Sequence, residues 1–135
     1  MGKAIIVTHG NLAECLYEAA GLFLSEREGL SAICLGEDLA LFKENLRAAI
    51  LEDEETDILL MADLFGGSPF NIAASLLPEA RAKGKHVEIL TGVNLPMILE
   101  IIPMITEQSG PELKEIALEA GKTGIRDLIA ELNRR

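Results

Sequence analysis

Tryptophan is absent from the sequence, and tyrosine, cysteine and histidine occur only one, two and two times. With only four phenylalanines besides, Ala, Leu and Ile must supply most of the core packing. The two cysteines, Cys15 and Cys34, lie in apolar-rich stretches. We predict that they are buried free thiols rather than a disulfide, because unpaired cysteine behaves as a small hydrophobic residue.

Positive charge is also in short supply, with 12 lysines and arginines against 22 acidic residues and a net charge of −10. This balance argues against nucleic acid and anionic membranes as partners, because both attract basic surfaces. An acidic surface can still steer a basic protein partner toward a binding site.

Long apolar runs are missing as well. The longest, near residues 95–105, is broken by Glu100 and Pro103 and is too short to span a bilayer. The N-terminal apolar run is too short for a signal peptide, and Ile6 stands where a myristoylation motif needs Ser or Thr. We therefore predict a soluble, cytoplasmic protein.

What the sequence does contain is an alternation of strand and helix patterns. An apolar content of 49% over 135 residues suffices for one packed core, so we assign residues 1–135 to a single domain. Apolar runs and helical spacing predict strands at 3–7, 30–35, 57–62 and 86–91, and helices at 12–25, 39–52 and 69–83. The last two helices are expected to be capped by Asp38 and Ser68. This alternation predicts an α/β, three-layer, flavodoxin-like domain with a central, mainly parallel sheet.

The C-terminal third follows a different pattern. Residues 94–105 are apolar on nearly every side, which is typical of a helix buried on more than one face. A subunit interface could supply the second face, so we expect a homodimer. The tail, residues 111–135, has helical spacing interrupted by Gly121 and Gly124. The stretch after Gly124 fits either a helix or an antiparallel edge strand.

Polar residues follow two of the predicted strands at the point where each ends. His9 comes after the first strand, and Asp63 comes after the third. The carboxyl ends of parallel strands form ligand sites, so His9 and Asp63 share one crevice if their strands are neighbours. A carboxylate that accepts a hydrogen bond from one imidazole nitrogen leaves the other nitrogen as a nucleophile. The pair therefore predicts nucleophilic catalysis by His9, oriented by Asp63.

The segment after Asp63 suits an anion. Gly66 and Gly67 allow backbone N–H groups to turn toward a ligand, and a helix begins directly behind them at Ser68. This edge has too few histidines, cysteines and clustered aspartates for a metal site, and no cofactor is expected. Taken singly, His9 fits a loop residue, Asp63 a turn or cap, and the glycines a plain helix start. Their conjunction at one edge favours a functional site.

Other candidate motifs are weaker. His86 follows a Lys-Gly-Lys turn at the amino end of the fourth strand, away from the crevice, and is predicted to be a surface residue. Gly121, Lys122 and Thr123 resemble the end of a phosphate loop, but Ile116 stands where that motif needs glycine. The sequence also lacks the G-x-S-x-G motif of serine hydrolases.

The sequence resembles the enzyme IIA component of the mannose-type (mannose/fructose/sorbose) phosphoenolpyruvate-dependent sugar phosphotransferase system. The matching motifs are THG at 8–10, DLFGGSPFN at 63–71 and TGVNLPM at 91–97, and they occur in order over nearly the whole chain. The second motif is specific, whereas the first alone is not.

The resemblance implies a phosphoryl carrier. His9 would accept the phosphoryl group from the phosphocarrier protein HPr and pass it to enzyme IIB, from which it reaches sugar at the membrane permease (IIC/IID). Asp63 would bond to the Nδ1 atom of His9 and leave Nε2 to take the phosphoryl group, whose oxygens would be held by Gly66, Gly67 and Ser68. The resemblance further implies a homodimer that exchanges a C-terminal antiparallel strand, and a separate IIB chain, since no IIB domain follows residue 135.

Three alternatives remain open at this point. The phosphotransfer subunit of a dihydroxyacetone kinase system shares the fold and an N-terminal histidine, although the GGSPFN segment argues against it. A non-catalytic regulatory module would be phosphorylated without passing the phosphoryl group on. A small-ligand-binding flavodoxin-like domain would need other loops, and no aromatic-rich flavin loop is present.

Overall fold

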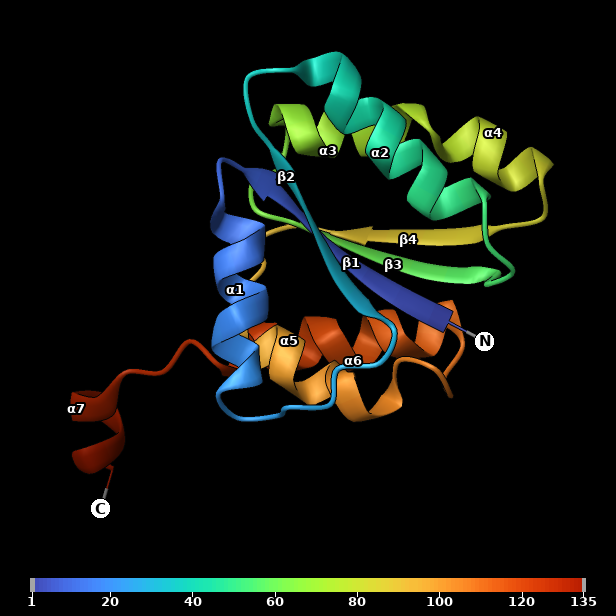
Figure 1. Cartoon of the computed structure of the whole chain (residues 1–135). Helices are drawn as coiled ribbons and strands as arrows, with labels where there is room; N and C mark the ends of the chain where they lie inside the picture. The colour runs from blue at the N-terminus through green and yellow to red at the C-terminus, as the bar shows by residue number, and fades with distance from the viewer. Residues whose placement is uncertain (1, 135) are drawn as a thin grey trace.

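A four-stranded parallel sheet forms the centre of the molecule in the computed structural model, which describes residues 2–134 (Figure 1). Its strands are β1 (Gly2–His9), β2 (Leu30–Leu35), β3 (Asp57–Ala62) and β4 (His86–Leu90). They lie in the order β2-β1-β3-β4, and every neighbouring pair is parallel. The α/β class and the parallel sheet predicted from the sequence are thus confirmed.

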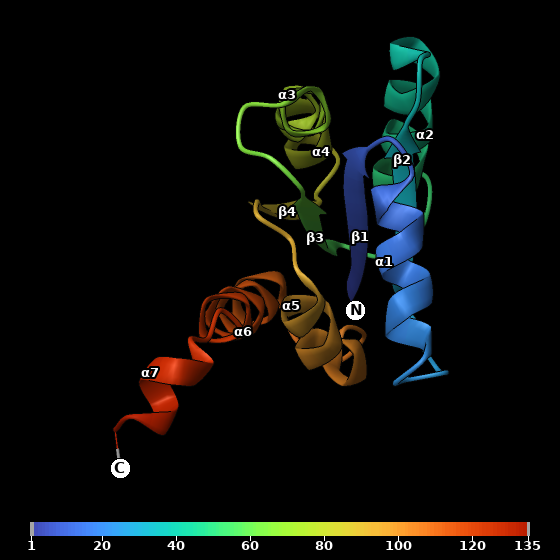
Figure 2. The same cartoon turned by 90° about the vertical axis from the view of Figure 1, so that its left-hand side faces the viewer.

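Helices cover both faces of this sheet and produce three layers (Figures 1 and 2). One face carries α1 (Leu12–Gly21), α5 (Leu95–Ile101) and α6 (Gly110–Thr123), with the short 3-10 helix η1 (Ile102–Met104) after α5. The other face carries α2 (Leu39–Leu51), α3 (Ser68–Ser75) and α4 (Leu77–Ala82).

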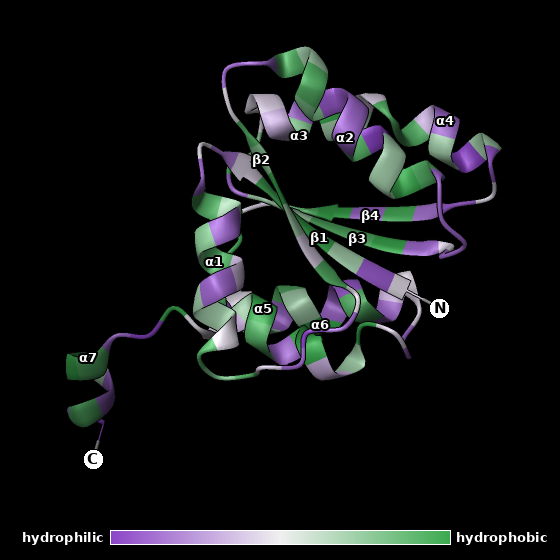
Figure 3. Cartoon of the chain, viewed as in Figure 1, coloured by the Kyte–Doolittle hydropathy of each residue, from purple (hydrophilic) through white to green (hydrophobic). Residues whose placement is uncertain are grey.

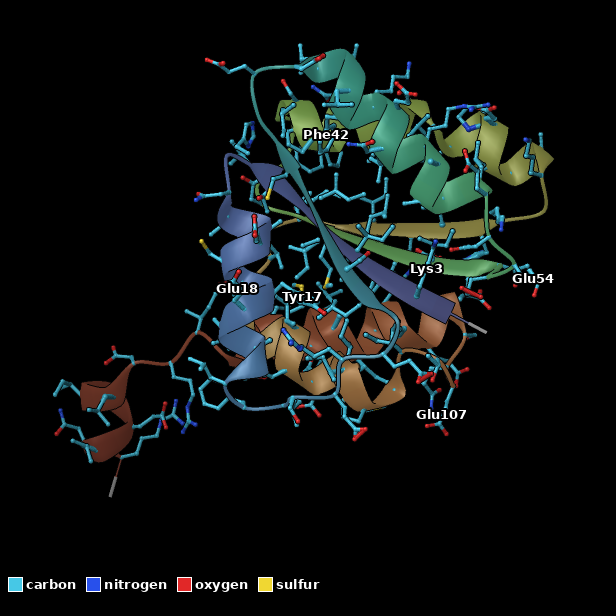
Figure 4. The ribbon with its side chains drawn as sticks, in the orientation of Figure 1. Lys3, Tyr17, Glu18, Phe42, Glu54 and Glu107 are labelled. Atoms are coloured by element: carbon cyan, nitrogen blue, oxygen red, sulfur yellow. The ribbon has the colours of Figure 1, made fainter. Side chains whose placement is uncertain are left out.

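The central strands are apolar along their length because both of their faces are buried. In β1, Ala4 and Ile6 pack toward the α1, α5 and α6 layer, while Ile5 and Val7 pack toward the opposite layer. The hydropathy colouring shows the strands as mostly green where they pass between the helices (Figure 3). Phe42 of α2 belongs to the same buried cluster as Ile5 and Val7 and is only 2% exposed. Glu18 on α1 is exposed, and both residues are labelled in Figure 4.

Two helices are shorter than the sequence pattern predicts. The first ends at Gly21 rather than residue 25, and the chain beyond it is tied back by Arg27, which donates to the carbonyl oxygen of Tyr17 (2.8 Å) and lies over its ring. The third predicted helix is divided into α3 and α4. Pro78 explains the division, because proline lacks an N–H and its ring clashes with the carbonyl four residues earlier.

Up to residue 134 the tail forms two helices, with a short non-helical segment between them. α6 continues through Gly121, whose missing side chain leaves room for Met97; a Cβ there would lie 2.8 Å from the Met97 Cε atom. The segment that fitted either helix or strand forms α7 (Leu128–Leu132), capped by Asp127, and stands apart from both layers (Figures 1 and 2). Within residues 2–134 the sheet contains no antiparallel strand, so a strand exchange between subunits is not observed.

The cysteine prediction is half right. Both thiols are free, but Cys15 is exposed and Cys34 only half-buried. The buried face of α1 is formed by Ala13 and Ala20, and Cys15 lies on the exposed face of the same helix. Over residues 2–134, no helix combines the length and the apolar character that crossing a membrane requires.

Candidate functional site

His9 is the last residue of β1, at the carboxyl edge of the sheet. The strand continues two residues beyond its predicted end, and His9 pairs with Leu35 of β2. On its other side β1 pairs with β3, where Val7 lies opposite Ala62. The two strands are therefore neighbours, and Asp63, which follows Ala62, lies beside His9.

Asp63 holds His9 through a single carboxylate oxygen. Its Oδ2 atom accepts a hydrogen bond from the His9 backbone N–H (3.1 Å) and lies 2.9 Å from the ring Nδ1. An ionised carboxylate can only accept, so Nδ1 carries the hydrogen and the neutral ring has its lone pair on Nε2. The Asp63 side chain is 16% exposed and that of His9 46%, so the carboxylate is sheltered while the ring remains open to solvent.

The charge of Asp63 is stabilised in this position. Burial raises the pKa of the Asp63 carboxyl, but the hydrogen bonds that it accepts from the His9 ring and backbone outweigh burial and hold the pKa below its usual range. The carboxylate therefore stays ionised at neutral pH, as the orienting role requires.

Thr8 and Gly10 fix the turn from β1 into α1. The Thr8 side chain is fully buried, and its hydroxyl oxygen accepts a hydrogen bond from the Ala13 N–H (2.6 Å). This bond replaces a conventional cap, since the side chain of Asn11 at the N-cap position makes no capping bond. Gly10 adopts φ +56°, which favours glycine. The role of Thr8 was not predicted from the sequence.

A tight turn carries the chain from Asp63 to α3. The Gly67 N–H donates to the Leu64 carbonyl oxygen (3.2 Å), and Gly66 adopts φ +82° at the position of such a turn that favours glycine. The Asn71 side-chain amide donates back to the Gly66 carbonyl oxygen (3.0 Å). Asn71, which lies near the start of α3, thereby stabilises the loop turn that precedes the helix. The sequence pattern did not suggest this role.

The start of α3 differs by one residue from the prediction. Gly67, not Ser68, is the N-cap residue, and Ser68 is the first residue of the helix. Ser68 is exposed, and its hydroxyl makes no hydrogen bond to any residue in the range 2–134. In the same range the N–H groups of Ser68 and Phe70 find no acceptor. Because the N-terminal N–H groups of a helix carry partial positive charge, this helix start is suited to an anion.

Exposed apolar side chains lie in the segments that follow the first three strands. We call this set the carboxyl-edge patch. Phe65 is the most exposed member at 76%, and its ring contacts that of Phe70, with centroids 4.6 Å apart. The patch consists of Leu12, Leu39, Leu41, Leu64 and Phe65. Because the three strands all end at this edge, these side chains follow the same end of the sheet as His9 and form a candidate protein-binding surface.

His86 lies at the other end of the sheet, at the start of β4, as its position in the sequence predicts. Its Nε2 atom is 2.6 Å from a carboxylate oxygen of Glu88, whose other oxygen is 3.2 Å from the Lys114 ammonium. The structure thus brings His9, Asp63, Gly66, Gly67 and Ser68 together at one edge and leaves His86 outside the site.

Comparison with known proteins identifies the family. The family described as "PTS system fructose IIA component" matches residues 3–118. The chain belongs to the mannose-type enzyme IIA family of the sugar phosphotransferase system. The matched segment contains every residue of the candidate site and both loops that build it.

Individual relatives of this mannose-type enzyme IIA agree. A mannose-specific EIIAB component from Escherichia coli K12 is 33% identical over 131 residues, which cover 94% of this chain but only 39% of that protein. A fructose-specific EIIA component from Bacillus subtilis is 33% identical over 107 residues, 77% of this chain and 70% of that protein. The crystal structure of an EIIA component from Streptococcus agalactiae superposes with a TM-score of 0.82 at 27% identity, covering 96% and 99% of the two chains.

Proposed function

We propose that this mannose-type enzyme IIA is a phosphoryl carrier, which accepts the phosphoryl group of phospho-HPr on His9 and passes it to enzyme IIB. One observation carries the proposal. The His9 ring is anchored to Asp63 through Nδ1 (2.9 Å), so that the unprotonated Nε2 remains available at an open edge of the sheet.

Transfer needs alignment more than acid–base chemistry. The Nε2 lone pair forms a bond to phosphorus while the phosphorus–nitrogen bond of the donor phosphohistidine breaks, and that electron pair stays on the donor ring. No proton has to move in this step, because Nδ1 keeps its hydrogen and donates it to Asp63 Oδ2 throughout. The carboxylate stabilises the positive charge that the His9 ring gains, and transfer onward to enzyme IIB follows the same path in reverse.

The start of α3, directly behind the Gly66–Gly67 turn, is assigned to the phosphoryl oxygens. Support comes from the free N–H groups of Ser68 and Phe70 and from the unbonded Ser68 hydroxyl. An anion placed there also meets the positive end of the α3 dipole. These groups can hold the oxygens while Nε2 attacks.

The carboxyl-edge patch is assigned to HPr and enzyme IIB. Both partners must bring a reacting atom within bonding distance of Nε2, so both must contact the surface around it. Leu64 and Phe65, exposed by 60% and 76%, project from the turn that adjoins His9. Exposed aromatic and leucine side chains of this kind are suited to short-lived partner contacts.

The remaining parts of the assignment rest on the family. The protein would act in the cytoplasm, with sugar phosphorylated at the membrane permease (IIC/IID), and as a homodimer. The apolar side chains of the tail support a homodimer, because a five-residue helix is not stable in water unless it packs on another surface. They are Ile125, Leu128, Ile129 and Leu132, all more than half exposed.

Phosphohistidine formation tests the proposal. The protein would be mixed with phosphoenolpyruvate, enzyme I and HPr, and its intact mass measured at alkaline pH, where phosphohistidine survives. We expect one added phosphoryl group on the wild type and on His86→Ala, and none on His9→Ala. Adding enzyme IIB should then discharge the labelled protein. Absence of label from the wild type, with partners shown to be active, would contradict the proposal.

A further inference from the structure

Gly67 is a glycine for a reason that its own backbone does not explain. Its φ of −76° and ψ of 171° are open to any residue. The neighbouring Gly66, at φ +82°, occupies the left-handed region that favours glycine. A Cβ atom on Gly67 would instead lie 2.7 Å from Cε1 and 3.2 Å from Nε2 of His9. The imidazole ring, and not the backbone, excludes a side chain at position 67.

The position of the His9 ring therefore depends on Asp63 on one side and on the absence of a side chain at Gly67 on the other. Asp63 Oδ2 binds it at Nδ1 at 2.9 Å, and its Cε1–Nε2 edge occupies the space that a side chain at position 67 would fill. The Gly67 backbone is itself fixed, because its N–H donates to the Leu64 carbonyl oxygen (3.2 Å). That bond also occupies the N–H that an anion would otherwise use.

We propose that Gly67 is a positioning residue. Its missing side chain leaves the space in which the His9 ring can stay bonded to Asp63 with Nε2 available for phosphorus. This inference rests on the proposed function and assigns to Gly67 the placement of the ring, in place of the phosphoryl-oxygen contact that the sequence suggested. The two adjacent glycines thus have different roles: Gly66 permits the positive φ of the turn, and Gly67 leaves room for the His9 ring.

The two glycines should respond to alanine in opposite ways. In Gly67→Ala the backbone conformation is permitted, so the thermal midpoint should hold or rise slightly. The 46%-exposed ring must swing away from the new methyl group and lose Asp63. In Gly66→Ala the methyl group meets no atom within 4 Å, but the positive φ is strained. That variant should be less stable while its His9 ring stays in place.

The test reads the tautomer of His9. Long-range proton–nitrogen NMR spectra would be recorded near pH 8.5, about two units above the ordinary histidine pKa of about 6.5, with His86→Gln identifying the second histidine. Wild type and Gly66→Ala should carry the hydrogen on Nδ1. Gly67→Ala should shift toward the Nε2–H tautomer and lose phosphoryl transfer from phospho-HPr by on the order of 100-fold, since small misplacements of reacting groups cost about that much.

Each other outcome is decisive. If Gly67→Ala keeps the Nδ1–H tautomer, Gly67 does not position the ring, whether or not the rate falls. If Gly67→Ala is unstable, combining it with His9→Ala must restore the thermal midpoint of His9→Ala alone; continued instability would overturn the steric account. If the wild type takes no phosphoryl group, the proposed function fails, but the tautomer comparison still decides the role of Gly67.

Discussion

Replacing Asp63 by asparagine separates the two contributions of this carboxylate. Asparagine keeps the shape and leaves an amide oxygen that can accept from Nδ1, but it removes the negative charge beside the ring. The loss of charge matters when Nε2 bonds to phosphorus, because the ring becomes positive at that moment. We therefore expect Asp63→Asn to bind phospho-HPr normally and to transfer the phosphoryl group slowly.

The size of the effect follows from the geometry. The accepting oxygen lies 2.9 Å from Nδ1, which places the centres of the two charges roughly 4 Å apart. Two unit charges at this distance attract by about 1 kcal/mol in water and about 4 kcal/mol at an effective dielectric constant of 20. With the carboxylate sheltered and the ring half-open, about 2 kcal/mol is a reasonable middle value, which corresponds to a rate loss of about 30-fold.

Rapid-quench transfer from radiolabelled phospho-HPr measures this rate under single-turnover conditions. Asp63→Ala, which also removes the anchor of the ring, should be slower than Asp63→Asn by about a further tenfold. Circular dichroism should show both variants folded, with thermal midpoints only slightly lowered. A wild-type rate in Asp63→Asn would refute the electrostatic role, and a wild-type rate in Asp63→Ala would refute the orienting role as well.

Three further predictions concern stability and partner contact. Because the pKa of Asp63 is lowered in the folded protein, its ionised form stabilises the fold above the unfolded value of about 3.9. That contribution is lost as pH falls below the unfolded value and through the lower folded pKa, so the stability difference between wild type and Asp63→Asn in urea unfolding should shrink over that range; a difference that persists would be inconsistent with an ionised, bonded Asp63. Thr8→Val leaves the buried Ala13 N–H without its acceptor and should cost about 1–3 kcal/mol of unfolding free energy, whereas Thr8→Ser should cost much less; equal costs would exclude the capping bond. Phe65→Ala should raise the KM for phospho-HPr by about tenfold at an unchanged thermal midpoint, while Leu22→Ala, also on an exposed leucine, should change neither; an unchanged KM in Phe65→Ala would remove that ring from the docking surface.

The arrangement of the site was predictable where strand ends decide it. His9 and Asp63 each follow an apolar run, and parallel strands bring such positions to one edge whatever the details of the loops. The only added condition was that β1 and β3 be neighbours, and their pairing of Val7 with Ala62 meets it. The orienting bond between the two side chains then follows from their proximity.

Features that depend on packing rather than periodicity were not predictable. The sequence does not distinguish the two adjacent glycines. Gly66 is required by its positive φ angle, whereas Gly67 is required because a side chain there would clash with the imidazole of His9. Thr8 reads as one more strand residue, because the Ala13 N–H that it binds belongs to a helix whose exact start the sequence does not mark. In both cases the residue that determines the role, His9 for Gly67 and Ala13 for Thr8, is brought into contact only by the folded turns at this edge.

Local signals could have resolved one open choice, the tail, and corrected one wrong prediction, the single helix at 69–83. Asp127 caps α7 by accepting from the Ala130 N–H (3.0 Å), and an aspartate just before an apolar periodic stretch is an ordinary helix-start signal. It would have favoured the helix over the edge strand. Pro78 likewise marks the division between α3 and α4, since a proline inside a helical pattern ends or kinks the helix before it.

The position of the phosphoryl group on the His9 ring tests the central claim most directly. The protein would be labelled with nitrogen-15 in its histidines, phosphorylated by phosphoenolpyruvate, enzyme I and HPr, and examined by proton–nitrogen NMR with phosphorus decoupling. A phosphorus coupling at Nε2 of His9, with the hydrogen still on Nδ1, is the result that the anchoring bond to Asp63 predicts. A phosphoryl group on Nδ1, or on any residue other than His9, would contradict the account.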